Sequence, residues 1–435
     1  MAPAPSTSLT AFLHDFISPE ALVAQARALG VVQRQRKAHV LSLVSAILFT
    51  LPVRGRVSRA AMWRAYLRRT GKTLSRSAFF KRFNKALAEL MRWLLDTIIQ
   101  RARDRPPTYT GLLEGFRDVI AADSSTITLP PALRDIWPGT TDDTAAIKLH
   151  TQIRATTGEL LKDKITAGTA ADSKHFGVTW ADAGSLFLLD RGYSGASLWF
   201  RIARVGGFFV TRLPASYKPT ILRSHRNHRG RARPVAGRKL REVLDEVERR
   251  VLDVTCGFRV HIGRYRSTRG RWEIHPFRVV GLKHPETGAY HLYVTNLPAA
   301  KWPAENIRDL YRLRWEVELS YRACKSGSGL AELASRDPEV VRLLVSAALI
   351  RETLAMQARL RAQATLPKCR WINPLMWLNV WNQEILAFIP VLAGTRRARL
   401  DLSFRTLARI AASPDRKRVP LRYSVLQEPP KKAYI

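Results

Sequence analysis

The sequence has few acidic residues for its size and almost no cysteine. Its 435 residues include 35 Asp plus Glu against 72 Lys plus Arg, which gives a formal net charge of +37. With 46% hydrophobic residues the chain is too apolar to be a disordered basic tail, and its length suits two or three domains. So large a basic excess favours a polyanionic partner, most commonly nucleic acid.

The sequence also lacks paired cysteines, a signal peptide and a membrane-spanning segment, and each absence argues against a class of protein. The three cysteines, Cys256, Cys324 and Cys369, form no CxxC pair, which argues against a disulfide framework and a structural zinc site. The N-terminus lacks the basic start and apolar core of a signal peptide. The longest apolar stretch, Ala38 to Val53, is too short for a membrane span and predicts a buried helix. We expect a cytoplasmic protein, on the nucleoid when bound to DNA, without a membrane partner.

The first hundred residues carry apolar residues at helical spacing and a strongly basic segment. Arg54 to Lys85 contains eleven basic residues and no acid. A break at Thr70-Gly71 and a capping residue at Ser75 predict two helices in a helix-turn-helix outline. This arrangement favours DNA binding, with the second helix in a major groove. The alternative is a plain helical hairpin with a solvated basic face.

After a Pro-containing stretch at residues 103–110, the pattern changes to short strands. Strand-like runs lie at 119–122, 145–154, 160–167, 185–189 and 207–212, with a helical segment at 196–205. Further strand-like runs follow at 251–262, 272–282 and 290–296. The pattern predicts a mixed α/β fold in which helices cover a mixed sheet.

Composition divides the chain into five expected parts. These are a helical DNA-binding domain at 1–105, the first part of an α/β core at 106–213, a β-rich insertion at 214–300, the second part of the core with C-terminal helices at 301–395, and a basic tail at 396–435.

Two carboxylates follow apolar runs in a chain that is short of acids. Asp123 follows VIAA, and Asp190 follows SLFLL. If the two strands are neighbours, both carboxylates open onto the same edge of the sheet and repel each other unless a cation lies between them. Oxygen ligands favour magnesium or manganese. For either aspartate alone, a turn or a helix cap is the commoner role.

The segment IRDLYRLRWEVELSYRACK places four functional side chains on one helical face. At about 100° per residue, Tyr311, Arg314, Glu318 and Lys325 fall within about 60° of one another. An adjoining apolar stripe can dock this helix on the sheet beside the two aspartates. The simpler alternative is a surface ladder with an Arg314–Glu318 ion pair worth about 0.3–0.5 kcal/mol.

The spacing of these four residues resembles the Y-(2)-R-(3)-E-(6)-K signature of bacterial insertion-sequence DDE transposases. In the same order along the chain, Asp123 and Asp190 resemble the first two acids of that family's triad. The resemblance covers about residues 115–330. It implies a ribonuclease-H-like catalytic core interrupted by a β-rich insertion, with helical regions at either end.

The resemblance also implies a catalytic role for three acids. Asp123, Asp190 and Glu318 would hold two Mg²⁺ or Mn²⁺ ions for cleavage of the element's ends and their transfer to target DNA. Expected partners are double-stranded DNA, through the terminal inverted repeats and the target, and a second copy of the chain in a synaptic homodimer. The alternatives are a DNA-binding protein or transposition inhibitor without catalysis, and a nuclease that cuts without joining.

Cations and aromatic residues complete the expected site. By the same resemblance, Tyr311, Arg314 and Lys325 contact phosphates near the scissile bond, and Arg191 is a further candidate.

Some members of this branch form a DNA hairpin in which a flipped base stacks on an aromatic residue of the insertion. Trp272 and Tyr290 are candidates for that stacking, although a core position is the more general expectation for Trp272. Asp172 and His175 could bind metal, but a helix cap is the commoner role of an Asp-Ser pair.

Overall fold

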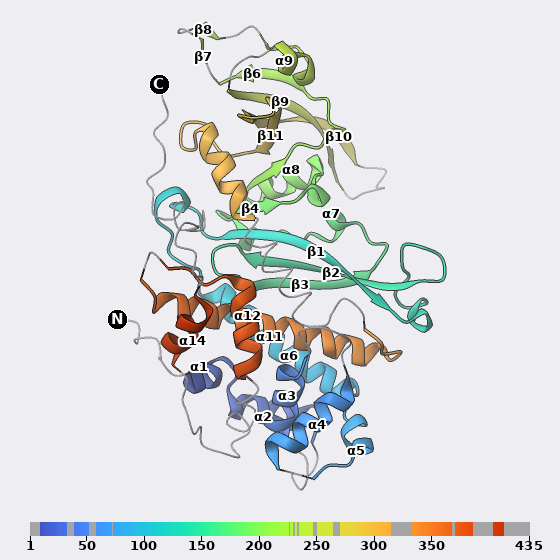
Figure 1. Cartoon of the computed structure of the whole chain (residues 1–435). Coiled ribbons are helices and arrows are strands. Elements are labelled where there is room, and N and C mark those ends of the chain that lie inside the picture. Colours follow the sequence, from blue (N-terminus) through green and yellow to red (C-terminus); the bar gives the residue numbers. More distant parts are fainter. Residues whose placement is uncertain are drawn as a thin grey trace.

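The structure is a computed structural model, and it describes most of the chain. The described residues are 9–32, 39–51, 58–71, 73–225, 227–228, 231–232, 235–246, 250–263, 270–314, 333–367, 370–385 and 403–412. Helices from the two ends of the chain pack together on one side of a long mixed sheet (Figure 1).

The described part of the N-terminal region contains the helices α1 Leu9–Phe16, α2 Pro19–Ala28, α3 Val40–Phe49, α4 Arg59–Thr70, α5 Arg76–Phe80 and α6 Lys85–Asp104. Helix α3 is buried along almost its whole length, which confirms the interpretation of the longest apolar stretch. Among the described residues, no helix combines the length and apolarity that crossing a membrane requires.

The predicted helix break is present, but the second helix is short. Gly71 ends α4 in the left-handed conformation at φ 66°, and the Ser75 hydroxyl accepts a hydrogen bond from Ala78 N at 3.2 Å. Helix α5 then ends at Phe80, because Asn84 caps the next helix by accepting from Leu87 N. Part of the basic segment, residues 52–57 and 72, lies outside the described residues. DNA binding by these helices stays a prediction.

Among the described residues, one sheet contains nine strands: β1 Val119–Leu129, β2 Ala145–Arg154, β3 Leu160–Ala167, β4 Leu186–Leu189, β5 Phe208–Arg212, β6 Thr220–Ser224, β9 Val251–Ile262, β10 Arg271–Lys283 and β11 Tyr290–Thr295. Their order is β3-β2-β1-β4-β5-β11-β10-β9-β6. Strand β2 is antiparallel to β1 and β3, whereas β1, β4 and β5 run parallel. This order and these directions over the first five strands are those of the ribonuclease-H-like fold.

The strands expected in the insertion continue the core sheet. Strand β11 pairs with β5 in antiparallel fashion, and β10, β9 and β6 follow outward. A separate ribbon joins β7 Asn227–His228 to β8 Arg231–Ala232. The connections also contain α7 Asp172–His175, α8 Ala196–Arg204, α9 Leu240–Glu246 and the 3₁₀ turns η1 Gly111–Leu113, η2 Pro131–Leu133, η3 Trp180–Asp182 and η4 Arg191–Tyr193. The domain boundaries stay a prediction.

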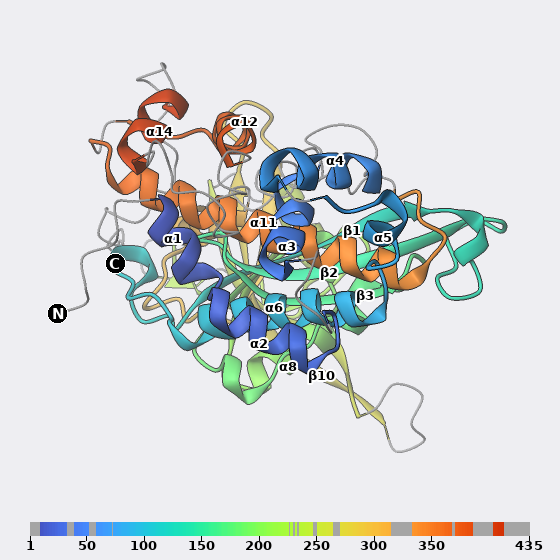
Figure 2. The same ribbon diagram turned by 90° about the horizontal axis from the view of Figure 1, so that it is seen from below.

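The two faces of the sheet belong to two apolar clusters. Ile127, Ile147 and Leu149 face a cluster that includes α6 and the long helix α11 Pro338–Ala364. Phe187 and Phe209 face the opposite side, where α8 packs. Figures 1 and 2 show α6 and α11 lying across one face of β1–β3. Two C-terminal helices, α12 Pro374–Glu384 and α14 Phe404–Ala411, pack against α11.

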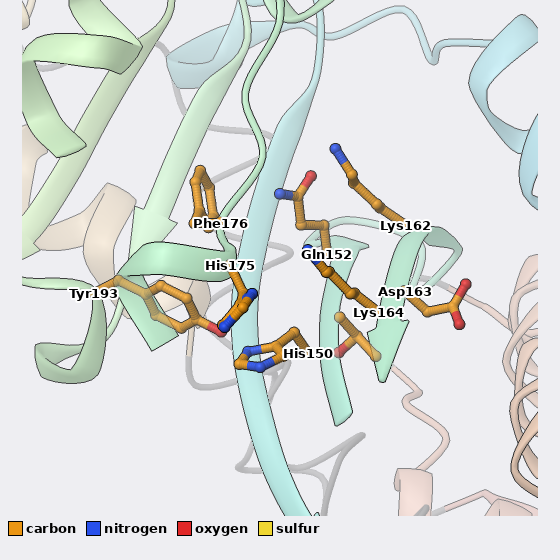
Figure 3. Close-up of a pocket in the computed structure, with 9 residues that line it drawn as sticks. His150, Gln152, Lys162, Asp163, Lys164, His175, Phe176 and Tyr193 are labelled. Carbon is orange, nitrogen blue, oxygen red and sulfur yellow. The ribbon is translucent and has the colours of Figure 1, made fainter. Parts of the chain in front are cut away.

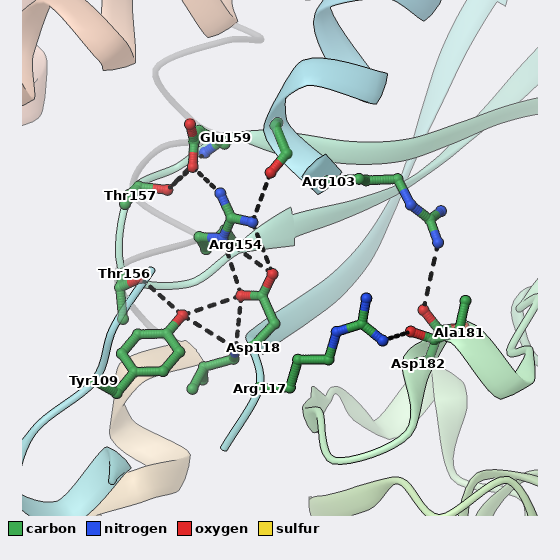
Figure 4. Close-up of polar contacts among 12 residues, drawn as sticks. Arg103, Tyr109, Arg117, Asp118, Arg154, Thr156, Thr157, Glu159, Ala181 and Asp182 are labelled. Carbon is green, nitrogen blue, oxygen red and sulfur yellow. Dashed lines mark hydrogen bonds and ion pairs between the residues drawn. The ribbon is translucent and has the colours of Figure 1, made fainter. Parts of the chain in front are cut away.

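A buried ion pair fixes the end of α6 to the sheet (Figure 4). Arg154 on β2, 1% exposed, donates from Nη2 to Asp118 at 2.9 Å and to the carbonyl of Ala102 at 2.9 Å. Asp118 also accepts from the Tyr109 hydroxyl at 3.0 Å. Burial, reinforced by the Asp118 charge, raises the pKa of Tyr109. The Pro-containing stretch between α6 and β1 is therefore anchored at both ends.

Candidate active site

Asp123 and Asp190 lie side by side on neighbouring parallel strands. Ala122 of β1 is paired with Leu189 of β4, so the next residue of each chain segment stands at the same level. Neighbouring strands lie about 4.8 Å apart. Asp190 keeps an extended backbone, φ −77° and ψ 171°, so the alternation of β4 continues through it. Both carboxylates therefore face the side of the sheet on which α6 and α11 pack.

The two aspartates differ in their local structure. Asp190 follows the last residue of β4, as predicted, and its side chain is 42% exposed. Asp123 does not end its strand, because β1 continues to Leu129 and pairs with β2 throughout. Its Oδ1 accepts a hydrogen bond from Ser124 N at 2.8 Å. The side chain is half-buried.

The helix that follows β11 brings a cation to this pair. Residues 304–314 are helical, and Leu310 and Leu313 are buried as the predicted apolar stripe requires. Arg314 Nη1 lies 3.7 Å from Asp190 Oδ1, and its guanidinium carbon lies 5.3 Å from the centroid of the Tyr311 ring. Burial raises the pKa of Tyr311, while Arg314 acts in the opposite direction. The structure thus brings together four of the predicted residues, namely Asp123, Asp190, Tyr311 and Arg314.

Glu318 and Lys325 lie outside the described residues. Their predicted place on the same helical face stays a prediction. Among the residues that are described, no three His, Cys, Asp or Glu side chains are grouped as metal ligands.

Arg212 belongs to the same edge of the sheet and was missed in the sequence. Leu189 of β4 pairs with Thr211 of the parallel strand β5, so Arg212 stands level with Asp190. Its guanidinium carbon lies 5.5 Å from the Tyr293 ring centroid, and that ring lies 5.3 Å from the Tyr311 ring. The signal was available, because Arg212 follows the apolar run FFV after a single threonine.

A hollow of about 370 Å³ adjoins this edge. Three arginines, Arg191, Arg212 and Arg241, line it together with Tyr217, Tyr290 and apolar side chains. Arg191 is exposed at the start of η4. Of the two aromatic candidates, Tyr290 lines the hollow and Trp272 does not.

The general expectation of a core position for Trp272 was wrong. Its side chain is 54% exposed, and Arg259 lies 4.8 Å from its ring centroid. Alternation along β10 explains this position, because Trp272 and the exposed Ile274 share the outward face of the strand.

Asp172 lies beside the site but on the other side of the sheet. It is the first residue of α7 rather than its cap, and its Oδ1 lies 3.3 Å from Lys148 Nζ and 3.7 Å from His150 Nδ1. A Cβ on Gly192, two residues after Asp190, would meet Asp172 Oδ2 at 2.9 Å. Asp172 therefore packs against the segment that carries Asp190.

The site has adjacent acids on neighbouring parallel strands of a ribonuclease-H-like sheet, with arginines beside them. This arrangement is typical of enzymes that transfer phosphoryl groups of nucleic acids. The Transposase DDE domain family matches residues 114–350, more than half of the chain. The chain belongs to this family of bacterial insertion-sequence DDE transposases, and it is an enzyme that acts on DNA.

Curated relatives agree with this assignment. The transposase of insertion sequence element IS231B from Bacillus thuringiensis subsp. berliner is 22% identical over 342 residues, which cover 71% of each chain. The IS231F transposase from B. thuringiensis subsp. israelensis is 23% identical over 353 residues, 72% of each chain. The IS421 transposase of Escherichia coli is 36% identical over 73 residues, 17% of this chain and 20% of its own.

A solved structure of the piggyBac transposase synaptic complex with hairpin DNA superposes over 94% of this chain and 87% of its own, at 10% identity and a TM-score of 0.49. The family assignment does not depend on it.

Proposed function

We propose that this transposase binds the terminal inverted repeats of an insertion sequence and cuts and joins DNA at a site built from Asp123, Asp190 and Glu318. The observation that carries the proposal is the register of three parallel strands. It sets Asp123, Asp190 and Arg212 at one level, with Arg314 at 3.7 Å from Asp190. Acids and cations at one edge suit a phosphodiester, whose charge needs both a metal and direct counter-charges.

The donor set supports a pair of hard divalent cations. Two adjacent carboxylates repel each other, and a cation with oxygen ligands relieves that repulsion. Asp123, Asp190 and Glu318 would hold two ions, Mg²⁺ or Mn²⁺. When bound, such ions activate a water or a DNA 3′-hydroxyl and stabilise the leaving oxygen.

The remaining residues would hold the DNA strand. Arg314 can donate two parallel hydrogen bonds to a phosphate, and the Tyr311 ring under its guanidinium keeps that group in one orientation. We assign phosphate contacts to Tyr311, Arg314, Lys325 and Arg191, and add Arg212 because of its level on β5. The charge of these groups neutralises the phosphate while the bond breaks.

Recognition of the element's ends is assigned to the N-terminal helices. We propose a helical DNA-binding domain at 1–105, a catalytic core at 106–213 and 301–395, an insertion at 214–300 and a basic tail at 396–435. Arg64, Arg68 and Arg76 are exposed on α4 and α5, which suits contact with phosphates. A homodimer in which each copy holds one end would allow both ends to be joined in one complex.

Three substitutions test the site. Asp123→Asn, Asp190→Asn and Glu318→Gln should each abolish Mg²⁺-dependent nicking of a duplex that carries the element's end, while gel shifts show unchanged binding. The exposed Asp135→Asn is the matched control and should nick normally. Undiminished nicking by one of the three variants removes that residue from the site.

The same assay separates the competing functions. A wild-type protein that binds ends but generates no new 3′-hydroxyl with Mg²⁺ or Mn²⁺ would be a DNA-binding protein or inhibitor. Cleavage without products joined to target DNA would indicate a nuclease. Short inverted repeats around the gene, flanked by a target duplication, would place it inside a mobile element.

A further inference from the structure

Strands β1, β2 and β3 project beyond the end of β4 and leave one face partly open. On this face Lys148 and Lys162 donate to the carbonyls of Ala170 and Gly177, which cover part of it. Strand β4 ends opposite Ala122, whereas β1 continues for seven more residues to Leu129. Along this projection one face is apolar and packs on the side of α6 and α11. The opposite face, here called the lysine–threonine face, consists of Thr126, Thr128, Lys148, Lys162, Lys164 and Thr166.

The lysine–threonine face carries more cations than acids. Asp163, between the two lysines of β3, points to the other face and accepts from Arg92 of α6 at 2.6 and 2.9 Å. Asp172, at the root of the face, pairs with Lys148. Within the described parts of the chain, neither Lys162 nor Lys164 makes an ion pair shorter than 4 Å. Burial lowers the pKa of Lys162 against the opposing charge of Asp182, and the nearby Arg103 and Lys164 lower it further.

A small hollow of about 20 Å³ lies at the root of this face (Figure 3). Its lining includes Lys162, Lys164, His175 and Tyr193. In Figure 3, Asp163 points away from the other labelled side chains. The hollow has room for one water, or for one oxygen of a phosphate whose other atoms stay outside.

Two polar atoms buried at the hollow are poorly satisfied. His150 Nδ1, on a residue that is 6% exposed, makes no hydrogen bond to a described residue and lies 3.7 Å from Asp172 Oδ1. The hydroxyl of Tyr193, a residue that is 2% exposed, has the hydroxyl of Ser124 as its neighbour. An unsatisfied buried polar atom costs about 1–3 kcal/mol, so such atoms usually meet a ligand or a water.

We infer that the lysine–threonine face binds the sugar–phosphate backbone of DNA next to the catalytic edge. Lysine ammonium and threonine hydroxyl groups contact phosphates without reading sequence. The charge of the face is complementary to that of a DNA backbone. A second copy of this chain is a poor occupant, because two such faces would repel.

Position links this face to the reaction. Strand β1 carries Asp123 on one face and, one, three and five residues later, Ser124, Thr126 and Thr128 on the other. Tyr193 at the hollow is three residues from Asp190. A duplex held at the catalytic edge can therefore continue over the projecting strands. The inference rests on the proposed function, because the DNA on this face is the DNA being cut or joined.

The test is the salt dependence of DNA binding by the full chain without divalent ions. A fluorescent duplex carrying the element's end and its flank is titrated at several salt concentrations. Lys162→Gln/Lys164→Gln should weaken binding and reduce the slope of log K against log salt by about 1 or more. Lys162→Arg/Lys164→Arg should keep the wild-type slope, because a phosphate contact needs the charge.

A matched pair controls for loss of charge. Lys283→Gln/Lys301→Gln removes two lysines that do not line the hollow and should change the slope less. Equal slopes for the two Gln pairs, with unchanged melting temperatures, overturn the inference. The inference is also overturned if Lys162→Gln/Lys164→Gln keeps the wild-type slope of log K against log salt but changes the oligomeric state, because the face would then be a protein interface. If either of these results is found while the wild-type protein still nicks DNA, the inference fails but the proposed function stands. If the wild-type protein does not bind DNA at all, the proposed function itself fails.

Discussion

Arg314 places its guanidinium 3.7 Å from the carboxylate of Asp190, across the gap between a helix and the end of β4. The contact joins an acid expected to hold metal to a cation expected to hold phosphate. Without a ligand the arginine offsets part of the negative charge of the aspartate pair. With DNA and ions bound, we expect the same guanidinium to turn to the phosphate.

Arg314→Ala should therefore separate catalysis from metal binding. We expect nicking to fall about 10²–10³-fold, the usual loss when one preorganised donor is removed from developing charge. Binding of Mn²⁺, measured by electron paramagnetic resonance of the free ion, should not weaken, because a competing cation has gone. The control is Arg342→Ala, which also removes an arginine stacked on an aromatic ring, that of Trp137. Weaker Mn²⁺ binding by Arg314→Ala would contradict this assignment.

Arg212→Gln tests the arginine that the strand register adds to the site. The substitution keeps polarity and most of the length but removes the charge that stands level with Asp190. We expect slower nicking and weaker binding of the duplex at the cleavage position, seen as loss of a footprint at the scissile phosphate. The exposed Arg204→Gln on α8 is the matched control. Wild-type rates in both variants would show that Arg212 only packs on Tyr293.

Removal of one partner from the buried pair at the end of α6 should destabilise the protein strongly. Arg154→Met leaves Asp118 buried without its cation and should cost about 3–5 kcal/mol, whereas Arg154→Met/Asp118→Leu should recover much of that loss. Arg134→Met breaks an exposed pair with Asp143 and should cost less than about 1 kcal/mol. Urea and thermal unfolding measure all three. A single variant as stable as Arg134→Met would refute the anchoring role.

Much of the catalytic edge could be predicted from the sequence, because parallel strands bring their carboxyl ends together. That rule placed Asp123 beside Asp190 and, applied once more, would have found Arg212. The same approach ended β1 too early, since the polar run after Asp123 resembles a turn, and only pairing with β2 reveals a strand. Average burial misplaced Trp272, because burial in a strand depends on which face is covered.

The lysine–threonine face was beyond sequence analysis for a similar reason. Thr126, Lys148 and Lys164 come from three separate strands, and nothing local shows that α6 and α11 occupy only the opposite side. The registers of β1–β2 and β2–β3 are needed before these residues form one surface.

His150 should make stability depend on pH in a defined window. Burial lowers its pKa to about 4, against the opposing charge of Asp172, whereas the unfolded imidazole titrates near about 6.5. Between these values the unfolded chain binds more protons, so stability is full above about pH 6.5 and falls as the pH drops towards 4, by up to about 3 kcal/mol.

His150→Gln removes that titration and should flatten the stability profile between pH 6.5 and 4, while His14→Gln on the exposed side of α1 should keep the wild-type profile. Other partly buried histidines, such as His225 and His275, have lowered pKa values too and keep a residual slope in every variant. The informative quantity is therefore the difference in the free energy of unfolding between the two variants, measured by urea unfolding from pH 6.5 to pH 4. Parallel profiles would mean that His150 becomes protonated in the folded protein near its ordinary pKa, with Asp172 rather than burial controlling its charge.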